Sequence, residues 1–296
     1  MKLKNSTTSA AYIFLTPALS AIFIFFFIPV LAAFIMSFTD FDIYSLSDFG
    51  RARFIGFDNY LQLFNDPLFW KALANTFYYV LIAGPLSIFV SLSAALLLND
   101  KLLKFKSIFR LTYFMPVVTT LVAVAIVWRF IYHPKFGILN YLLGFFGIGN
   151  IDWLGDPHYA LPAIILMSVW KNFGYNMIIF IAGLQNIPEY LYEAATLDGA
   201  NKWQQFKNIT LPMLAPTTLF ITIITMIGFF QVFAEPYIMT QGGPLDSTLS
   251  IVLYMYREGF RWWNMGYSAA IAFVLFLIIL IATIIQFKIQ KKSAML

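Results

Sequence analysis

Few side chains in this chain could do chemistry. The sequence has no cysteine and two histidines, His133 and His158, both in segments predicted to be loops. These counts exclude disulfides, thiolate metal ligands and thiol catalysis, and they argue against a zinc site. No G-x-x-x-x-G-K-[S/T] segment is present to cradle nucleotide phosphates. The sequence therefore predicts no catalytic residue, no metal site and no cofactor bound by this chain.

Polar side chains do occur inside two long apolar segments. They recur there at helical spacing, so each set shares one helix face: Asn172, Tyr175 and Asn176 in the first segment, and Thr218, Thr222 and Thr225 in the second, with the aromatic Phe229 one turn further on. Polar groups in a bilayer interior must face protein or water. The threonines have an equally simple alternative, which is to bond their own helix backbone.

Lys171 stands beside these polar groups and is harder to explain. A charge at this depth is costly unless it reaches a cavity or a partner. The sequence assigns it no role.

The composition identifies the elements that hold these residues. Of 296 residues, 60% are hydrophobic and only 11% are charged, whereas soluble domains carry about 25% charged residues. Segments of about 20 apolar residues can cross a bilayer. Six are predicted, at residues 12–38, 76–98, 111–132, 159–184, 213–233 and 267–287. Pro29 is expected to kink the first, and Gly84 with Pro85 to interrupt the second.

The most polar long segment of the C-terminal half is residues 193–212, EAATLDGANKWQQFKNITLP, called here the EAA stretch. Asn186 is predicted to cap a helix that has Pro188 in its first turn. Gly199 occupies the position of a left-handed C-terminal residue, and Asn201 can cap a second short helix. Pro212 suits the first turn of the next span. On this pattern alone, an ordinary connector between two membrane helices is equally supported.

The distribution of charge predicts the topology. Basic residues gather in the segments that share a side if both termini are cytoplasmic: Lys2, Lys4, Lys101, Lys104, Lys106, Arg110, Lys202, Lys207, Lys288, Lys291 and Lys292. Most acidic residues fall on the other side, including Asp40, Asp42, Asp48 and Asp58. This agrees with the positive-inside rule and places the EAA stretch in the cytoplasm.

The EAA stretch carries a longer pattern: E-A-A, three residues, G, nine residues, then I-x-L-P. It resembles the loop signature of the membrane subunits of ABC importers. The segments YIFLTPAL, FIGFDNY, NDPLFWKALANT, IDWLGDP, MSVWKNFGYNM and QGGP resemble the carbohydrate branch of that family, in its maltose/glycerol-phosphate first-permease type. The chain lacks the large external domain and the extra N-terminal helices of the maltose permease itself.

The resemblance implies an all-α integral membrane protein with the type I importer permease fold and a cytoplasmic coupling helix. It implies docking on a separate ATPase through Glu193, Ala194, Ala195, Gly199, Ile209, Leu211 and Pro212. The implied partners are a second homologous permease, two ATPase subunits that hold ATP and Mg, an external sugar-binding protein and the lipid bilayer, without nucleic acid. A sugar would be contacted by Asn172, Tyr175, Asn176, Thr222, Thr225 and Phe229.

Two further readings stay open at this point. An ion-coupled secondary transporter usually needs carboxylates inside the membrane, and the predicted spans contain almost none. A membrane enzyme or sensor would need a nucleophile, a metal site or an attached domain. Within the importer reading, the solute could also be a polyol or a sugar phosphate.

Three parts are expected along the chain. Residues 1–75 comprise a cytoplasmic tip, the first span and an external loop. Residues 76–287 form the permease core, with the coupling loop at 185–212. Residues 288–296 are a cytoplasmic tail. The QGGP turn is expected to precede an amphipathic helix capped by Asp246 or Ser247.

Overall fold

The computed structural model describes residues 2–47, 51–100 and 104–293. Asp48 and Lys101, both used in the topology argument, lie outside the described residues. The chain divides into two compact units. Unit 1 contains residues 1–66 and 255–276, and unit 2 contains residues 67–254 and 277–296.

Unit 1 begins with a long apolar helical segment. α1 (Lys2–Ile22) continues through a π-helical segment (Phe23–Phe27) into α2 (Ile28–Met36), with Pro29 in the first turn of α2. A π-turn before a proline relieves the missing backbone hydrogen bond, so the expected irregularity at Pro29 takes this form. Phe34 of α2 packs edge-on against Phe273, with ring centres 5.0 Å apart.

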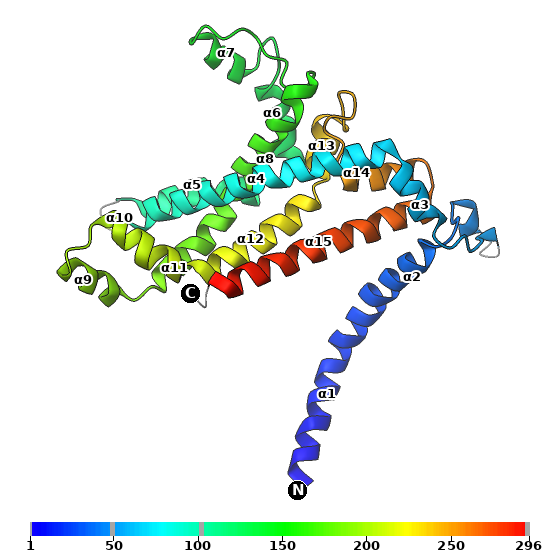
Figure 1. The fold of residues 1–296 in the computed structure, drawn as a ribbon, viewed down its shortest axis with the longest axis horizontal. Helices are drawn as coiled ribbons and strands as arrows, with labels where there is room; N and C mark the ends of the chain where they lie inside the picture. The colour runs from blue at the N-terminus through cyan, green and yellow to red at the C-terminus, as the bar shows by residue number, and fades with distance from the viewer. Residues whose placement is uncertain (1, 48–50, 101–103, 294–296) are drawn as a thin grey trace. The chain divides into compact units, whose positions relative to one another are not determined.

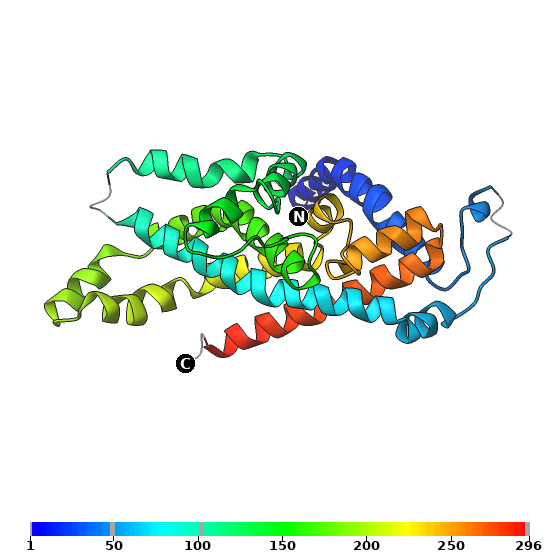
Figure 2. The ribbon, with the colours of Figure 1, turned by 90° about the horizontal axis from the view of Figure 1, so that it is seen from above.

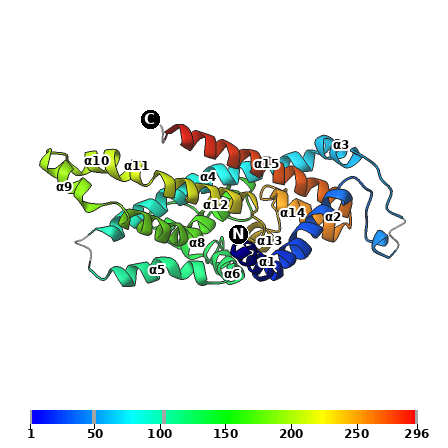
Figure 3. The same cartoon turned by 90° about the horizontal axis from the view of Figure 1, so that it is seen from below.

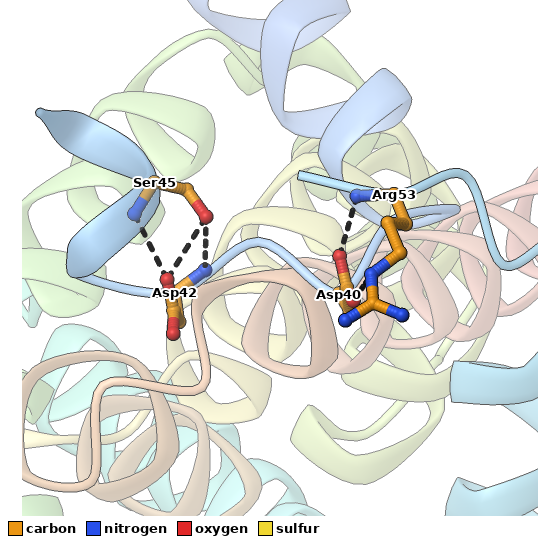
Figure 4. Close-up of polar contacts among 4 residues, drawn as sticks. All are labelled: Asp40, Asp42, Ser45 and Arg53. Atoms are coloured by element: carbon orange, nitrogen blue, oxygen red, sulfur yellow. Dashed lines mark hydrogen bonds and ion pairs between the residues drawn. The ribbon is translucent and has the colours of Figure 1, made fainter. Parts of the chain in front are cut away.

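The segment after α2 is folded and is not a plain loop. Thr39 forms a bridge with Phe54, and the Asn59 amide donates to the carbonyls of Ser37 and Thr39 at 2.9 Å each. Figure 4 shows two further ties, from Asp42 to Ser45 and from Asp40 to Arg53. The Ser45 N–H lowers the pKa of the Asp42 carboxyl below its ordinary value, because it stabilises the charged form. α3 (Asp58–Asn65) follows, in a region that was predicted to be loop.

Unit 2 holds the remaining helices of the chain (Figure 1). They are α4 (Pro67–Asn99), α5 (Lys106–Val118), α6 (Leu121–Ile131), α7 (Ile138–Gly144), α8 (Pro157–Gln185), α9 (Glu189–Leu197), α10 (Lys202–Gln205), α11 (Leu211–Met213), α12 (Ala215–Phe230) and α13 (Ala234–Met239). α14 (Ile251–Tyr256) and α15 (Met265–Ser293) contribute residues to both units.

Helices occupy the predicted spans, and the second and third spans differ from the predictions in shape or extent. Within the described residues, five helices are long and apolar enough to cross a membrane, or up to six if a bent pair counts as one span. The bent pair is α5 and α6, whose axes differ by 99°, where the sequence predicted one span over 111–132. α4 passes through Gly84 and Pro85 without interruption, so the predicted break there was wrong. α4 also begins before its predicted start, at Pro67.

The core of unit 2 lies where α4, α8 and α12 meet. α4 packs along α8, as Figure 2 also shows, and α12 contacts both. The buried cluster at one end of this contact consists of Ala95, Leu98, Met177, Phe180, Ile181, Leu184, Ile187, Leu214 and Ile221. This cluster fixes the ends of the helices from which the EAA stretch projects.

Candidate functional site

The EAA stretch folds as two short helices at one end of unit 2, the end where α5 begins (Figures 1 and 3). Pro188 is the N-cap of α9, with ψ of 132°, whereas Asn186 closes the C-terminus of α8. The predicted N-cap at Asn186 was therefore wrong. α8 runs as far as Gln185, and only a short turn remains before α9.

Gly199 ends α9 in the left-handed conformation that the sequence predicted, with φ of +79°. The Ala200 N–H donates to the Ala195 carbonyl at 2.8 Å, and the Gly199 N–H donates to the Thr196 carbonyl at 3.1 Å. This pair of hydrogen bonds is a Schellman motif. Among the described residues, no atom outside the chain neighbours of Gly199 lies within 4 Å of where its Cβ would stand, so backbone strain alone favours glycine here.

α10 begins with the predicted cap at Asn201. The Asn201 side chain accepts from the Gln204 N–H at 2.9 Å, and the Gln204 side chain accepts from the Asn201 N–H at 2.8 Å. These bonds form a complete capping box. The helix then continues through a π-helical segment (Phe206–Thr210) into α11, with Pro212 in the first turn of α11.

Two side chains that the sequence analysis missed hold the two helices together. Gln205 is buried, and its amide donates to the Thr196 hydroxyl at 2.9 Å and to the Ala200 carbonyl at 3.2 Å. The Tyr192 and Thr210 hydroxyls are hydrogen-bonded at 2.9 Å. The sequence does not indicate that Gln205 and Tyr192 make these bonds, because both side chains are polar and their partners lie on the neighbouring helix.

The signature residues divide between surface and core. Glu193, Ala194, Gly199, Leu211 and Pro212 are exposed. Ala195 is half-buried, and Ile209 packs against the buried cluster at the ends of α4, α8 and α12. Ile209 therefore links the EAA stretch to the spans, while the exposed members remain accessible to another protein.

An open groove of about 1070 Å³ lies between the EAA stretch and the ends of α4 and α8. Its lining combines apolar, acidic and basic side chains: Leu96, Asn99, Asp100, Leu184, Gln185, Ile187, Glu189, Tyr192, Glu193, Thr196, Leu197, Lys202, Gln205, Phe206 and Thr210. A concave surface with apolar walls and a few charges is suited to binding a protein element.

The residues predicted to contact a sugar, called here the polar path, include one pair that is hydrogen-bonded between two spans. The Asn176 amide of α8 donates to the Thr225 hydroxyl of α12 at 3.0 Å, and both side chains are buried. Phe229 is also buried, and its ring meets that of Tyr79 edge-on with centres 5.4 Å apart. The structure therefore places Asn176 and Thr225 against each other across two spans.

The other predicted path residues lie apart from this contact. Asn172 donates to the Ser168 carbonyl of its own helix at 2.9 Å, and Thr222 donates to the Thr218 carbonyl at 2.7 Å. Tyr175 is 49% exposed on the surface of α8. Thr222 thus makes the bond to its own helix backbone that is the alternative to a ligand contact.

The QGGP segment is an anchored turn. Gln241, Leu245 and Asp246 all have positive φ, between 51° and 55°. α4 holds the turn, because Lys71 donates to the Leu245 carbonyl at 2.6 Å and Asn75 donates to the Asp246 carbonyl at 2.8 Å.

The helix after this turn begins later than predicted. α14 starts at Ile251, and the Ser250 hydroxyl accepts from the Leu253 N–H at 3.2 Å. Asp246 and Ser247 are therefore not its cap. The left-handed backbone at Asp246 takes the chain through one more turn before the helix can start.

At the start of α8, Asp156 is the N-cap and accepts from the His158 N–H at 2.8 Å. This bond lowers the pKa of the Asp156 carboxyl below its ordinary value. Among the residues that the structure describes, no group of three His, Asp or Glu side chains could hold a metal ion.

Comparison with known proteins assigns the family. Residues 91–294 match the model of the family described as binding-protein-dependent transport system inner membrane component. The chain belongs to this family. It is a multi-pass membrane permease of the ABC transporter class.

Curated relatives cover almost the whole chain. The arabinooligosaccharides transport system permease protein AraP of Bacillus subtilis is 37% identical over 96% of this chain and 90% of its own length. The lactose transport system permease protein LacF of Rhizobium radiobacter is 37% identical over 93% of this chain and 92% of its own. The probable ABC transporter permease protein YurN of B. subtilis is 38% identical over 97% of this chain and 98% of its own length.

The fold also matches a solved structure, a bacterial ABC transporter involved in the import of the acidic polysaccharide alginate. The TM-score is 0.83 with 23% identity, over 99% of both chains. A second structure of an alginate ABC transporter, in complex with alginate pentasaccharide-bound periplasmic protein, gives the same TM-score. The fold is therefore that of an ABC importer permease, as predicted.

Proposed function

We propose that this chain forms half of the translocation path of an ATP-driven, binding-protein-dependent importer of oligosaccharides or related carbohydrates. The observation that carries the proposal is the complete E-A-A…G…I-x-L-P signature on an exposed pair of helices, in a chain of this family. A second, homologous permease would form the other half.

Carbohydrate is the proposed solute because relatives of high coverage are named for arabinooligosaccharide and lactose transport. The chemistry of the spans supports it. A sugar needs uncharged donors and acceptors and stacks on aromatic rings. We propose Asn172, Tyr175, Asn176, Thr222, Thr225 and Phe229 as the residues that would make both kinds of contact. A polyol or a sugar phosphate is the alternative solute within the same mechanism.

Coupling is proposed to pass through the EAA stretch to a separate ATPase. Glu193, Ala194 and Gly199 are exposed on α9 and its end, and the adjacent groove offers apolar and charged contacts. Small side chains let another protein surface approach closely. ATP and Mg would be held by the two ATPase subunits.

On the opposite side of the membrane, the anchored QGGP turn is proposed to receive the sugar-binding protein. The hydrogen bonds from Lys71 and Asn75 hold the turn in one conformation, and Leu245 at its tip is exposed. A rigid surface loses less conformational entropy on docking. This arrangement requires both termini and the EAA stretch to be cytoplasmic, as the positive-inside rule predicts.

Purification of the chain from its native membrane, followed by reconstitution, tests the proposal. We expect an ATPase, a second permease and a binding protein to be isolated together. Uptake of a labelled oligosaccharide should need ATP inside the vesicle and should persist when ionophores remove ion gradients. Uptake by the chain alone, driven by a proton or sodium gradient, would instead identify a secondary transporter.

A further inference from the structure

The break between α5 and α6 leaves a helix end inside a spanning segment. α5 ends at Val118, and α6 begins at Leu121 after a bend of 99° (Figure 1). The last four carbonyls of a helix have no partner within it, and no water is available in a bilayer core to satisfy them. The carbonyls at the end of α5 therefore need donors from elsewhere in the protein.

Two side chains supply these donors. The Thr119 hydroxyl donates to the Met115 carbonyl at 3.0 Å. The Lys171 ammonium, on α8, donates to the Pro116 carbonyl at 3.2 Å and to the Val117 carbonyl at 3.4 Å. A cation is also favoured at this position, because the C-terminus of a helix carries a partial negative charge.

The packing around Lys171 brings α5 and α8 close together. Gly174 is one turn further along α8, on the same face. A Cβ on Gly174 would overlap the Tyr113 carbonyl oxygen of α5, so the close contact requires glycine. The Phe173 and Tyr113 rings extend the contact, with centres 5.8 Å apart.

The Lys171 ammonium finds its partners inside the protein. Lys171 is only 9% exposed. A lysine that is buried and bonded to two backbone carbonyls serves the protein's own structure.

We propose that Lys171 is a positioning residue that holds the broken third span against α8, with its ammonium capping the C-terminus of α5 and with Gly174 allowing the contact. The inference deepens the proposed function, since it assigns Lys171 to the shape of the translocation path and not to contact with the solute.

The test uses pulsed electron paramagnetic resonance on the purified transporter complex in nanodiscs. The chain has no native cysteine, so two introduced cysteines at the exposed positions Ile108 and Phe130 can carry spin labels on α5 and α6. We expect one narrow distance distribution in the parent. Lys171→Met and Gly174→Ala should broaden or shift it, and Lys171→Arg should restore most of it. Gly84→Ala is the matched control, because a Cβ there meets no atom of another described segment within 4 Å.

Uptake kinetics separate positioning from solute contact. We expect Lys171→Met to lower the maximal rate about tenfold or more, with KM for the labelled oligosaccharide changed less than about twofold. If Lys171→Met does not accumulate in membranes, Lys171→Gln is measured, since its amide can still donate to one carbonyl. An unchanged distance distribution in Lys171→Met and Gly174→Ala would overturn the inference. A raised KM at normal maximal rate would overturn it too and would assign Lys171 to the solute.

The distance measurement needs no substrate. A parent complex without ATP-driven uptake would refute the proposed function, whereas the distances would still decide the role of Lys171.

Discussion

The EAA stretch and the polar path differ in where their polar groups find partners. In the EAA stretch the backbone groups at the helix ends are hydrogen-bonded within the stretch, by a Schellman motif and a capping box. Glu193 and Ala194 are exposed. In the polar path the key bond, from Asn176 to Thr225, joins two spans. The first region is shaped locally and leaves a surface exposed. The second is shaped by helix packing, so a change in it is transmitted between spans.

Gly199→Val should have the largest effect on coupling to ATP hydrolysis, because it changes the backbone at the end of α9 in the EAA stretch. A left-handed backbone costs a β-branched residue roughly 1–2 kcal/mol, which is enough to redirect the end of α9. We expect normal membrane insertion but loss of solute-stimulated ATP hydrolysis in proteoliposomes.

Gly147→Val is the matched control for this change. Gly147 has nearly the same backbone, with φ of +76°, and open space around it. We expect it to retain stimulated hydrolysis. Equal losses in both variants would mean that the Gly199 effect reflects general destabilisation.

Tyr175→Ala should abolish uptake and leave assembly and basal ATP hydrolysis intact, because it removes an aromatic surface from the proposed path without opening the core. Uptake and hydrolysis are measured in the same vesicles. Asn172→Ala is the companion variant. Unchanged uptake kinetics in both would place the path on another face of α8.

Removal of the Asn176 to Thr225 bond should destabilise the protein by a smaller, measurable amount. In each single variant the remaining buried partner would be unsatisfied. Asn176→Leu and Thr225→Val should therefore each lower the free energy of unfolding by more than half of the decrease in the double variant. We expect a coupling of about 0.5–1.5 kcal/mol from a double-mutant cycle of unfolding in detergent. A cycle of Asn176→Leu with Thr222→Val should show no coupling, because Thr222 bonds its own helix.

Asn201→Ala should have the smallest effect, confined to the start of α10. Loss of an N-cap costs about 1 kcal/mol, so amide exchange should accelerate in α10 while the spans stay protected. Asn208→Ala, at an exposed position in the following turns, should leave exchange unchanged. Faster exchange throughout the spans in Asn201→Ala would contradict a locally shaped EAA stretch.

The sequence predicted what local chemistry controls. Gly199 and Asn201 have the backbone and hydrogen bonds that their residue types indicate, and apolar length located the spans. It did not predict the bend between α5 and α6, because Thr119 and Thr120 resemble any polar pair in a helix. The ammonium that bonds the carbonyls at the end of α5 lies on another helix, at Lys171. Pro85 led to a predicted break that α4 does not have, because a proline within packed membrane helices need not break them.

In the EAA stretch, too, features set by neighbouring residues were predicted and features set by contacts between helices were not. The cap at Asn186 was misplaced because Asn186 closes the C-terminus of α8, and the extended Pro188 begins α9. Gln205 and Tyr192 were missed because their bonds reach across to a neighbouring helix. The predicted parts at 1–75, 76–287 and 288–296 stay a proposal.

Photo-crosslinking from a single introduced cysteine tests the central claim most directly. Leu197 is 89% exposed at the end of α9, and Phe146 is 81% exposed after α7, in the segment predicted to lie outside. Each would carry the same short photoreactive label in the purified complex. The account predicts an adduct with the ATPase subunit from position 197, with a yield that changes on ATP addition, and none from position 146. An ATPase adduct from position 146, or none from position 197 in a complex that contains the ATPase, would contradict it.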